Sequence, residues 1–260
     1  MFPAARRRKI LELIEREGAV GMRQLADAVG TSEVTVRRDL RQLESEGLLV
    51  RHRGGAVALP PDHNEPTYAE KTRVAADHKE AIAARAAELV VPGDAIIIGA
   101  GTTTHALAQR LAGHNDVAVV TNSILVADAL AGSSGVEVTM TGGSLRGSTY
   151  ALVGPSAESS LGHLHAKRLF ISGNGLTAAR GLTTPNPVVA SMDRAMVAAA
   201  RQVVVLADHT KIGQDTMVST APPHAITTVV TDAEADPGEL AALRAAGVDV
   251  VVVQPSWTHA

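Results

Sequence analysis

The chain of 260 residues has no cysteine, one Trp, two Tyr, two Phe and no long apolar run. Without cysteine, disulfides, thiolate metal ligands and thiol nucleophiles are all excluded. With so few aromatic residues, the core must be built from Val, Ile, Leu and Ala. No segment approaches the ~20 apolar residues of a membrane-spanning helix, and no apolar signal core follows the basic residues 6–9. We therefore expect a soluble, cytoplasmic protein.

Charge is distributed unevenly along the chain. Residues 1–58 carry 11 Lys and Arg against 8 Asp and Glu, and residues 59–260 carry 13 against 19. The net charge of −3 thus combines a balance of +3 with one of −6, which favours a polyanionic partner for the N-terminal part. Pro60, Pro61 and Pro66 interrupt regular structure. We predict a first domain at 1–58, a linker at 59–66 and a second domain at 67–260.

The first domain contains three segments with apolar residues at helical spacing. The stripes are Ile10, Leu13 and Ile14, then Met22, Leu25, Ala26 and Val29, then Val36, Leu40 and Leu43. Gly18 and Gly30 are suited to end the first two helices, and Ser32 to cap the third. Only about three residues separate the second and third helices, which is the tight turn of a helix-turn-helix.

The third helix presents a cationic face opposite its apolar stripe. At ~100° per residue, Val34, Arg38 and Arg41 project outward. Arg38 and Arg41 are suited to bidentate bonds with a guanine edge. Ser32 and Thr35 suit phosphate oxygens or a thymine methyl, and Arg37, nearer the flank, suits phosphate.

A glycine-rich basic segment follows this helix. Gly47 is expected to end the helix, and Leu48 to Gly55 to form a two-stranded wing with a tight turn. Arg51, His52 and Arg53 would then reach a neighbouring DNA backbone or minor groove. Taken alone, the third helix could be a solvated basic helix of an interaction module. The turn, cap and wing in order favour DNA binding.

The second domain begins with a helical segment, 68–90, and continues with short β-branched runs that alternate with helices. The predicted strands are 95–98, 117–121, 136–140, 169–172, 203–207, 228–230 and 250–253. Strands buried on both faces indicate an α/β fold with a mostly parallel sheet between helices. Ligands of such folds bind beyond the carboxyl ends of the strands.

Four predicted strand ends are polar and rich in glycine: GAGTTT at 99–104, TNS at 121–123, GGS at 142–144 and GNG at 173–175. Glycine permits close backbone approach, and Thr hydroxyls with helix N-terminal amides bind phosphate. Each loop alone could be an ordinary tight turn. Together they predict an effector site made of Gly101, Thr102, Thr103, Thr104, Asn122, Ser123, Gly142, Gly143 and Asn174.

A fifth strand end adds two charged candidates. Asp208 can bond sugar hydroxyls, and Lys211 can neutralise a phosphate. A surface turn with a local ion pair is the alternative.

These motifs resemble the DeoR family of bacterial transcriptional regulators. The matching residues are Ser32, Thr35 to Leu40, Gly54 to Ala56, Gly101 to Thr103, Thr121 to Ser123, Gly142, Gly143, Asp208 and Lys211. Arg53, Ala100 and Asp193 stand where the family usually has His, Ser and Lys. The resemblance implies a winged helix-turn-helix followed by a sensor domain similar to ribose-5-phosphate isomerase. It also implies a phosphorylated sugar or polyol effector.

We accordingly expect a transcriptional regulator, and a repressor over an activator. It would bind a repeated or palindromic operator in double-stranded DNA as a homodimer or homotetramer. The alternative is an enzyme: Asp208 as general base with Lys211 stabilising an enediolate would give a sugar-phosphate isomerase with a fused DNA reader. No second acid/base carboxylate is evident, which favours sensing. We expect no cofactor and no metal, because His163 and His165 have no further ligand at suitable spacing.

Overall fold

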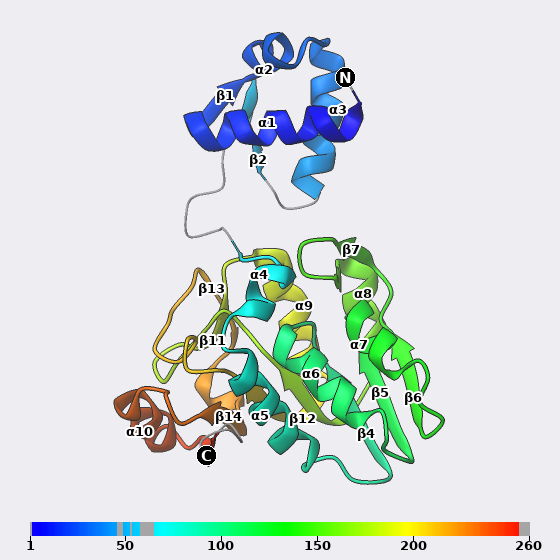
Figure 1. Ribbon diagram of the computed structural model, residues 1–260, viewed down its shortest axis with the longest axis vertical. Coiled ribbons are helices and arrows are strands. Elements are labelled where there is room, and N and C mark those ends of the chain that lie inside the picture. Colours follow the sequence, from blue (N-terminus) through cyan, green and yellow to red (C-terminus); the bar gives the residue numbers. More distant parts are fainter. Residues whose placement is uncertain (1, 46–48, 53, 58–64, 255–260) are drawn as a thin grey trace. The chain divides into compact units, whose positions relative to one another are not determined.

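The computed structural model describes residues 2–45, 49–52, 54–57 and 65–254 and consists of two compact units that divide between Asn64 and Glu65 (Figure 1). Most of the expected linker, 59–64, lies outside the described residues, as do Gly47, Leu48 and Arg53. Glu65 and Pro66 belong to the second unit.

The first unit contains the three predicted helices, α1 (Pro3–Glu17), α2 (Met22–Val29) and α3 (Glu33–Ser45). Gly18 ends α1 with a φ of 74°, and Gly30 ends α2 in the left-handed conformation that glycine adopts without a steric penalty. The Ser32 hydroxyl accepts a hydrogen bond from the Thr35 amide at 3.3 Å at the start of α3. The predicted breaks between the helices are confirmed.

A small antiparallel sheet, in the order β1-β3-β2, completes this unit. It contains β1 (Ala19–Gly21), β2 (Val50–His52) and β3 (Gly55–Val57). The hairpin of β2 and β3 is the predicted wing, whereas β1 was not predicted because three residues carry no usable alternation. The predicted stripes pack together, with Ile10, Leu25, Val36 and Leu40 fully buried.

The second unit is built on a seven-stranded parallel sheet in the order β15-β14-β12-β9-β4-β5-β6. Its strands in chain order are β4 (Asp94–Ile98), β5 (Val117–Thr121), β6 (Val136–Met140), β9 (Ala166–Ile171), β12 (Ala200–Leu206), β14 (Thr228–Asp232) and β15 (Asp249–Val253). Each predicted strand corresponds to one of these. The fold class is confirmed.

Alternate residues of the strands enter two separate cores. Ile96 and Ile98 face one layer of helices while Ile97 faces the other, and Phe170 is likewise opposite its neighbours Leu169 and Ile171. The first layer is α5 (Ala76–Ala87), α6 (Thr102–Leu111) and α7 (Ile124–Leu130), and the second is α8 (Pro155–Ser160), α9 (Pro187–Ala198) and α10 (Pro237–Ala245). Every helix in the described part of the chain is too short or too polar to cross a bilayer.

Two small antiparallel sheets, absent from the sequence prediction, lie outside the main one. They are β7 (Ser144–Arg146) with β8 (Ala151–Val153), and β10 (Gly175–Thr177) with β11 (Gly181–Thr184) and β13 (Val218–Ala221). A 3₁₀ turn, η2 (Pro223–Ala225), follows β13. Their strands have three or four residues, too few for a periodic signal.

The single helix predicted over 68–90 is wrong: two helices, α4 (Tyr68–Arg73) and α5, meet at a sharp break. Ala75 has a φ of 51° there, which an L-residue adopts at a cost. The break is held by the Lys79 ammonium, which donates to the carbonyl oxygens of Lys71 and, at 2.6 Å, of Val74. Helix propensity alone cannot reveal a break that a side chain stabilises from the next helix.

Gly55 in the wing is predicted to tolerate no side chain. A Cβ there would overlap the carbonyl oxygen of Val20 and lie 3.0 Å from the Cα of Gly21, because β1 and β3 cross closely. Gly55→Ala should destabilise the first unit by about 1 to 3 kcal/mol, measured by calorimetric unfolding of the full chain. Gly21→Ala is the control, since its Cβ would lie 3.9 Å from the nearest atom. Equal transitions in both variants would contradict the predicted overlap.

Candidate functional site

Helix α3 exposes the cationic face that the sequence predicts. Val34 is 73% exposed, and Arg37, Arg38 and Arg41 are exposed as well. Within the described ranges, the guanidinium groups of these three arginines have no hydrogen bond or ion pair. Their charge is therefore available to an external anion, and the α3 stripe behind them is fixed in the core.

Two further contacts orient this face. The Arg6 guanidinium donates from Nε to the buried carboxylate of Asp39 at 2.5 Å, which ties α1 to the recognition helix. The pKa of Arg6 is raised by this hydrogen bond to Asp39. Arg51, a wing residue predicted to contact DNA, donates from Nε to Glu44 of α3 at 2.5 Å. The expected contact of Arg53 lies outside the described residues.

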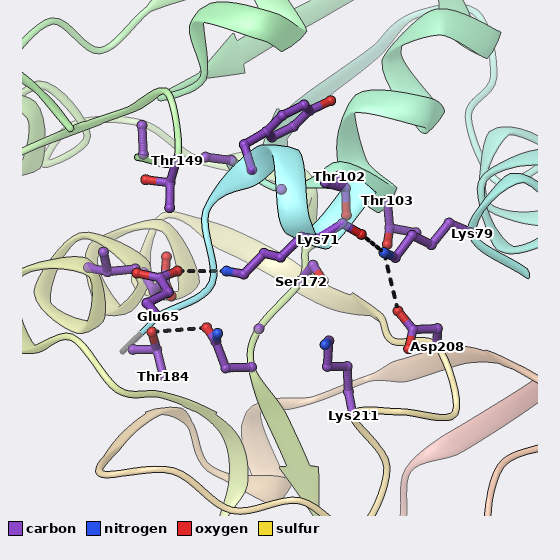
Figure 2. Close-up of a pocket in the computed structure, with 18 of the residues that line it drawn as sticks. Glu65, Lys71, Lys79, Thr102, Thr103, Thr149, Ser172, Thr184, Asp208 and Lys211 are labelled. Carbon is purple, nitrogen blue, oxygen red and sulfur yellow. Dashed lines mark hydrogen bonds and ion pairs between the residues drawn. The ribbon is translucent and has the colours of Figure 1, made fainter. Parts of the chain in front are cut away.

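A pocket of about 710 Å³, a volume that includes open solvent, lies in the second unit at the carboxyl ends of four adjacent strands, β5, β4, β9 and β12 (Figure 2). Seven of the predicted effector residues line it. These residues are Gly101, Thr102, Thr103, Asn122, Asn174, Asp208 and Lys211. The order of strands in the sheet brings together loops that are far apart in sequence.

Four predicted effector residues do not line the pocket. The Thr104 hydroxyl donates to the Gly101 carbonyl at 3.1 Å, and the Ser123 hydroxyl caps α7 by accepting from Val126 N–H. Gly142 and Gly143 follow β6, an edge strand, whereas the pocket is formed by more central strands. The role of Gly143 is close packing, because a Cβ would lie 2.7 Å from the carbonyl oxygen of Val153.

Lys211 supplies the available positive charge of the pocket. Its side chain is half-buried, and within the described ranges its ammonium has no hydrogen bond or ion pair. The amino terminus of α6, at Thr102 and Thr103, lines the same pocket. A lysine and unsatisfied helix N–H groups together favour an anion.

Asp208 is buried and strongly fixed. Its Oδ1 accepts from both the amide (3.0 Å) and the hydroxyl of Thr210, and its Oδ2 lies 3.9 Å from the Lys79 ammonium. Burial lowers the pKa of Lys79, an effect that Asp208 partly opposes and Lys211 adds to. Lys79 is thus committed to Asp208 and to the break between α4 and α5.

Two carboxyl groups occupy the wall contributed by α9 and the segment before α4. Glu65, 7% exposed, accepts from Lys71 at 2.7 Å and from Arg146 at 2.8 Å. Burial would raise the pKa of Glu65, but these two cations outweigh it and lower the pKa. Burial, together with the nearby charge of Glu65, raises the pKa of Asp193 to about 8. The premise that no second carboxylate accompanies Asp208 is therefore wrong.

Several pocket residues were not predicted as effector contacts. They are Glu65, Tyr68, Lys71, Lys79, Ala100, Thr149, Ala151, Ser172, Gly173, Thr184, Val189 and Asp193. For Lys79 a signal was present: it shares the buried face of Ile82, Ala83 and Ala86, where a charged residue needs a partner. His105 does not line the pocket; its Nδ1 lies 2.6 Å from the Tyr68 hydroxyl, and burial lowers its pKa.

Comparison with known proteins gives matches over both units. The model of the DeoR-like helix-turn-helix domain matches residues 6–61, and that of the DeoR C-terminal sensor domain matches residues 74–233. The HTH-type transcriptional regulator GlpR of Haloferax volcanii is 39% identical over 96% of this chain and 98% of its own. The HTH-type transcriptional repressor GlcR of Bacillus subtilis is 31% identical over 98% of both.

Solved structures are more distant. Ribose 5-phosphate isomerase A from Methanocaldococcus jannaschii aligns with a TM-score of 0.40 and 16% identity, over 53% of this chain and 54% of that one. A likeness at this level says nothing about activity. The sequence relatives and both family models show that the chain belongs to the DeoR family of helix-turn-helix transcriptional regulators.

Proposed function

We propose that this regulator is a repressor that binds operator DNA through residues 1–58 and responds to a phosphorylated sugar or polyol bound by residues 67–260. The observation that carries the effector assignment is the Lys211 ammonium, which has no partner among the described residues and lines one pocket with the amino terminus of α6. A phosphate placed between them would gain both the point charge and the backbone N–H donors. Ligand hydroxyls would then extend toward Asn174, Asp208 and Asp193.

The carboxyl wall supports a hydroxyl-rich ligand. With a pKa of about 8, Asp193 is protonated at neutral pH and can donate a hydrogen bond as well as accept one. Asn174 accepts from Thr184 at 3.3 Å through Oδ1, which leaves its amide N–H groups to donate. Such alternating donors and acceptors suit a polyol chain.

Coupling to DNA would run through Glu65, the first residue of the second unit. Its two ion pairs join the pocket wall to α4 and to β7, and residues 59–64 of the expected linker come directly before it in the chain. An effector that changes these ion pairs would alter the spacing of the DNA-binding domains in a homodimer or homotetramer. Two recognition helices one DNA turn apart are separated by ~34 Å. Coupling requires different effector affinities for the two states.

We further propose that the sensor domain binds its ligand in the cytoplasm without converting it. The oxygens of Asp208 are engaged by Thr210 and face Lys79, so they are poorly placed to abstract a proton. Turnover of a phosphosugar by the full chain, lost in Asp208→Asn, would instead establish the isomerase alternative.

Arg38 and Arg37 are predicted to differ in what they read. Arg38→Ala should lose about 1 to 3 kcal/mol of operator binding and relax base preference, whereas Arg37→Ala should weaken all sequences alike. Fluorescence anisotropy with operator and random duplexes at fixed salt measures both. Arg16→Ala, on an exposed side chain paired with Glu17, is the control. Equal losses on both duplexes for both variants would refute the assignment.

Substitutions of Lys211 and Lys79 are predicted to have different effects, on ligand binding for Lys211 and on the stability of the fold for Lys79. Thermal-shift screening of phosphorylated sugars and polyols identifies a stabilising ligand. Lys211→Gln should abolish that shift and leave the ligand-free transition unchanged, because its ammonium has no described partner to lose. Lys79→Gln should instead lower the ligand-free stability by about 1 to 3 kcal/mol, since it removes the bonds at the break between α4 and α5.

The same variants test coupling to DNA. Lys211→Gln should bind the operator like the parent protein and no longer respond to the stabilising ligand. Loss of operator binding with the response retained would contradict its role. A ligand that saturates the parent protein and leaves operator affinity unchanged would refute the coupling itself.

Asp193 is predicted to make the parent protein less stable as pH rises. Its folded pKa of about 8 exceeds the unfolded value of about 3.9, so between these values the folded state holds a proton that the unfolded state lacks. The contribution of this proton to the free energy of unfolding is complete below the unfolded pKa and is lost as the pH rises toward 8. Asp193→Asn removes this dependence, and its stability relative to the parent should increase from pH 6 to 8 and then level off in urea titrations. A gap that is constant with pH would be the contrary result.

A further inference from the structure

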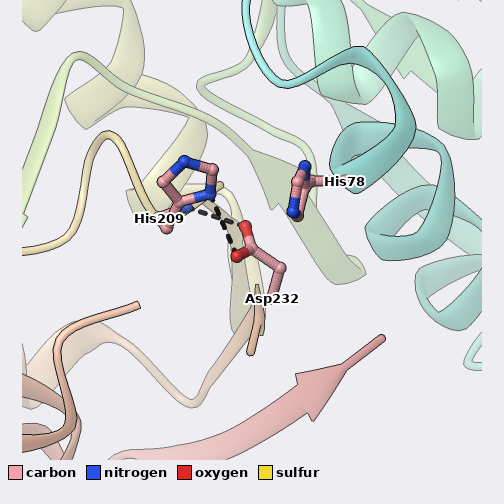
Figure 3. Close-up of side chains that lie close together, drawn as sticks. All are labelled: His78, His209 and Asp232. Atoms are coloured by element: carbon pink, nitrogen blue, oxygen red, sulfur yellow. Dashed lines mark hydrogen bonds and ion pairs between the residues drawn. The ribbon is translucent and has the colours of Figure 1, made fainter. Parts of the chain in front are cut away.

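A second cluster of polar side chains lies at the carboxyl edge of the sheet, one strand beyond the effector pocket (Figure 3). His209 follows β12, Asp232 is the last residue of the adjacent strand β14, and His78 lies near the start of α5. One ligand atom from each of the three lies within 4.8 Å of the others. None of these residues lines the effector pocket.

The Asp232 carboxylate is fully buried and held in place. Its Oδ2 accepts from the His209 amide at 2.8 Å, and its Oδ1 accepts from the Glu234 amide at 3.0 Å and lies 3.0 Å from the His209 ring nitrogen Nδ1. A buried carboxylate without a full countercharge is costly. This one has only N–H donors and the His209 imidazole against it among the described residues.

The outer side of the cluster is closed by Glu234. Its carboxylate oxygens lie 3.1 Å from Nε2 of His78 and 3.6 Å from Nε2 of His209, and its side chain is 58% exposed. The two imidazole rings are 4.8 Å apart between centroids at an interplanar angle of 70°. Two imidazoles and two carboxylates therefore converge from three separate elements.

We propose that His78, His209 and Asp232, with Glu234 as a solvent-facing fourth ligand, bind a divalent transition-metal ion of the Zn²⁺ type. Zn²⁺ takes four imidazole and carboxylate ligands at about 2.0 to 2.2 Å, which puts ligand atoms roughly 3.3 Å apart in a tetrahedron. With His209 binding through Nδ1, the separations of 3.0 Å between His209 Nδ1 and Asp232 Oδ1 and of 3.1 Å between His78 Nε2 and Glu234 Oε1 are near that spacing. Two imidazoles disfavour Mg²⁺ and Ca²⁺, which prefer oxygen.

The consequence for the molecule is local. The ion would join α5 to the loop at 208–211, which also carries Asp208 and Lys211. Binding to the folded state alone also raises its stability. The site does not depend on the proposed phosphosugar, so either proposal can fail without the other.

The test is a Zn²⁺ titration of full-length, tag-free protein that has been stripped with a chelator, in competition with a chromophoric zinc indicator. We expect one tight site per chain, weakened at least about 100-fold in His78→Ala and in His209→Ala, since removing even an outer partner of a metal ligand costs 10- to 100-fold. His163→Ala, at an exposed histidine on the connection after α8, should match the parent.

A second measurement protects against misfolded variants. Metal-free His78→Ala should unfold at the temperature of the metal-free parent. Zn²⁺ should raise the unfolding temperature of the parent only, and Mg²⁺ should raise that of neither protein. Equal zinc affinity in the parent and both histidine variants, or no zinc-induced shift in the parent, would overturn the site. In that event the cluster is a hydrogen-bonded network without an ion.

Discussion

The contacts of the buried Lys79 ammonium connect the helix break between α4 and α5 to the pocket of the sensor unit. It bonds the carbonyls at the end of α4 and faces Asp208 at the end of β12, so one charge fixes a strained helix break and one wall of the pocket. Without it, the left-handed backbone at Ala75 would lose the bonds that brace the break, and the buried carboxylate of Asp208 would keep its bonds from Thr210 but lose its nearest cation. The same cation thereby braces the end of α4, the helix that carries the pocket residues Tyr68 and Lys71.

The pocket divides its charges between fixed and available groups. Lys71 and Lys79 are paired with carboxylates, whereas Lys211 has no carboxylate partner in the described part of the chain, and the carboxyl of Asp193 is kept neutral by burial. Within the described residues, the pocket therefore offers the Lys211 ammonium and a largely uncharged polar wall. This distribution favours a molecule with a single anionic end, and the ion pairs at Glu65 place the wall next to the chain that leads to the DNA-binding unit.

The sequence was sufficient for features that local chemistry determines. Gly30, Ser32 and the stripe of Val36 and Leu40 predict the helix-turn-helix, and β-branched runs predict every strand of the main sheet. The sequence was insufficient to predict contacts between residues that are far apart in the chain. Asp193 enters the pocket from α9, and His78 meets Asp232 from 154 residues away, since only the strand order brings them together. The strand β1 was missed because three residues have no period.

The loop after β12 presents consecutive side chains to different surroundings: Asp208 to the pocket of the second unit, and His209 to the cluster with Asp232. Surface loops commonly accept insertions and deletions as proteins diverge. This loop is different, because the insertion or deletion of one residue between Leu206 and Lys211 would displace Asp208 and Lys211 from the pocket or His209 from Asp232. Its length should therefore be as strictly constrained as its composition, even where the neighbouring loops vary.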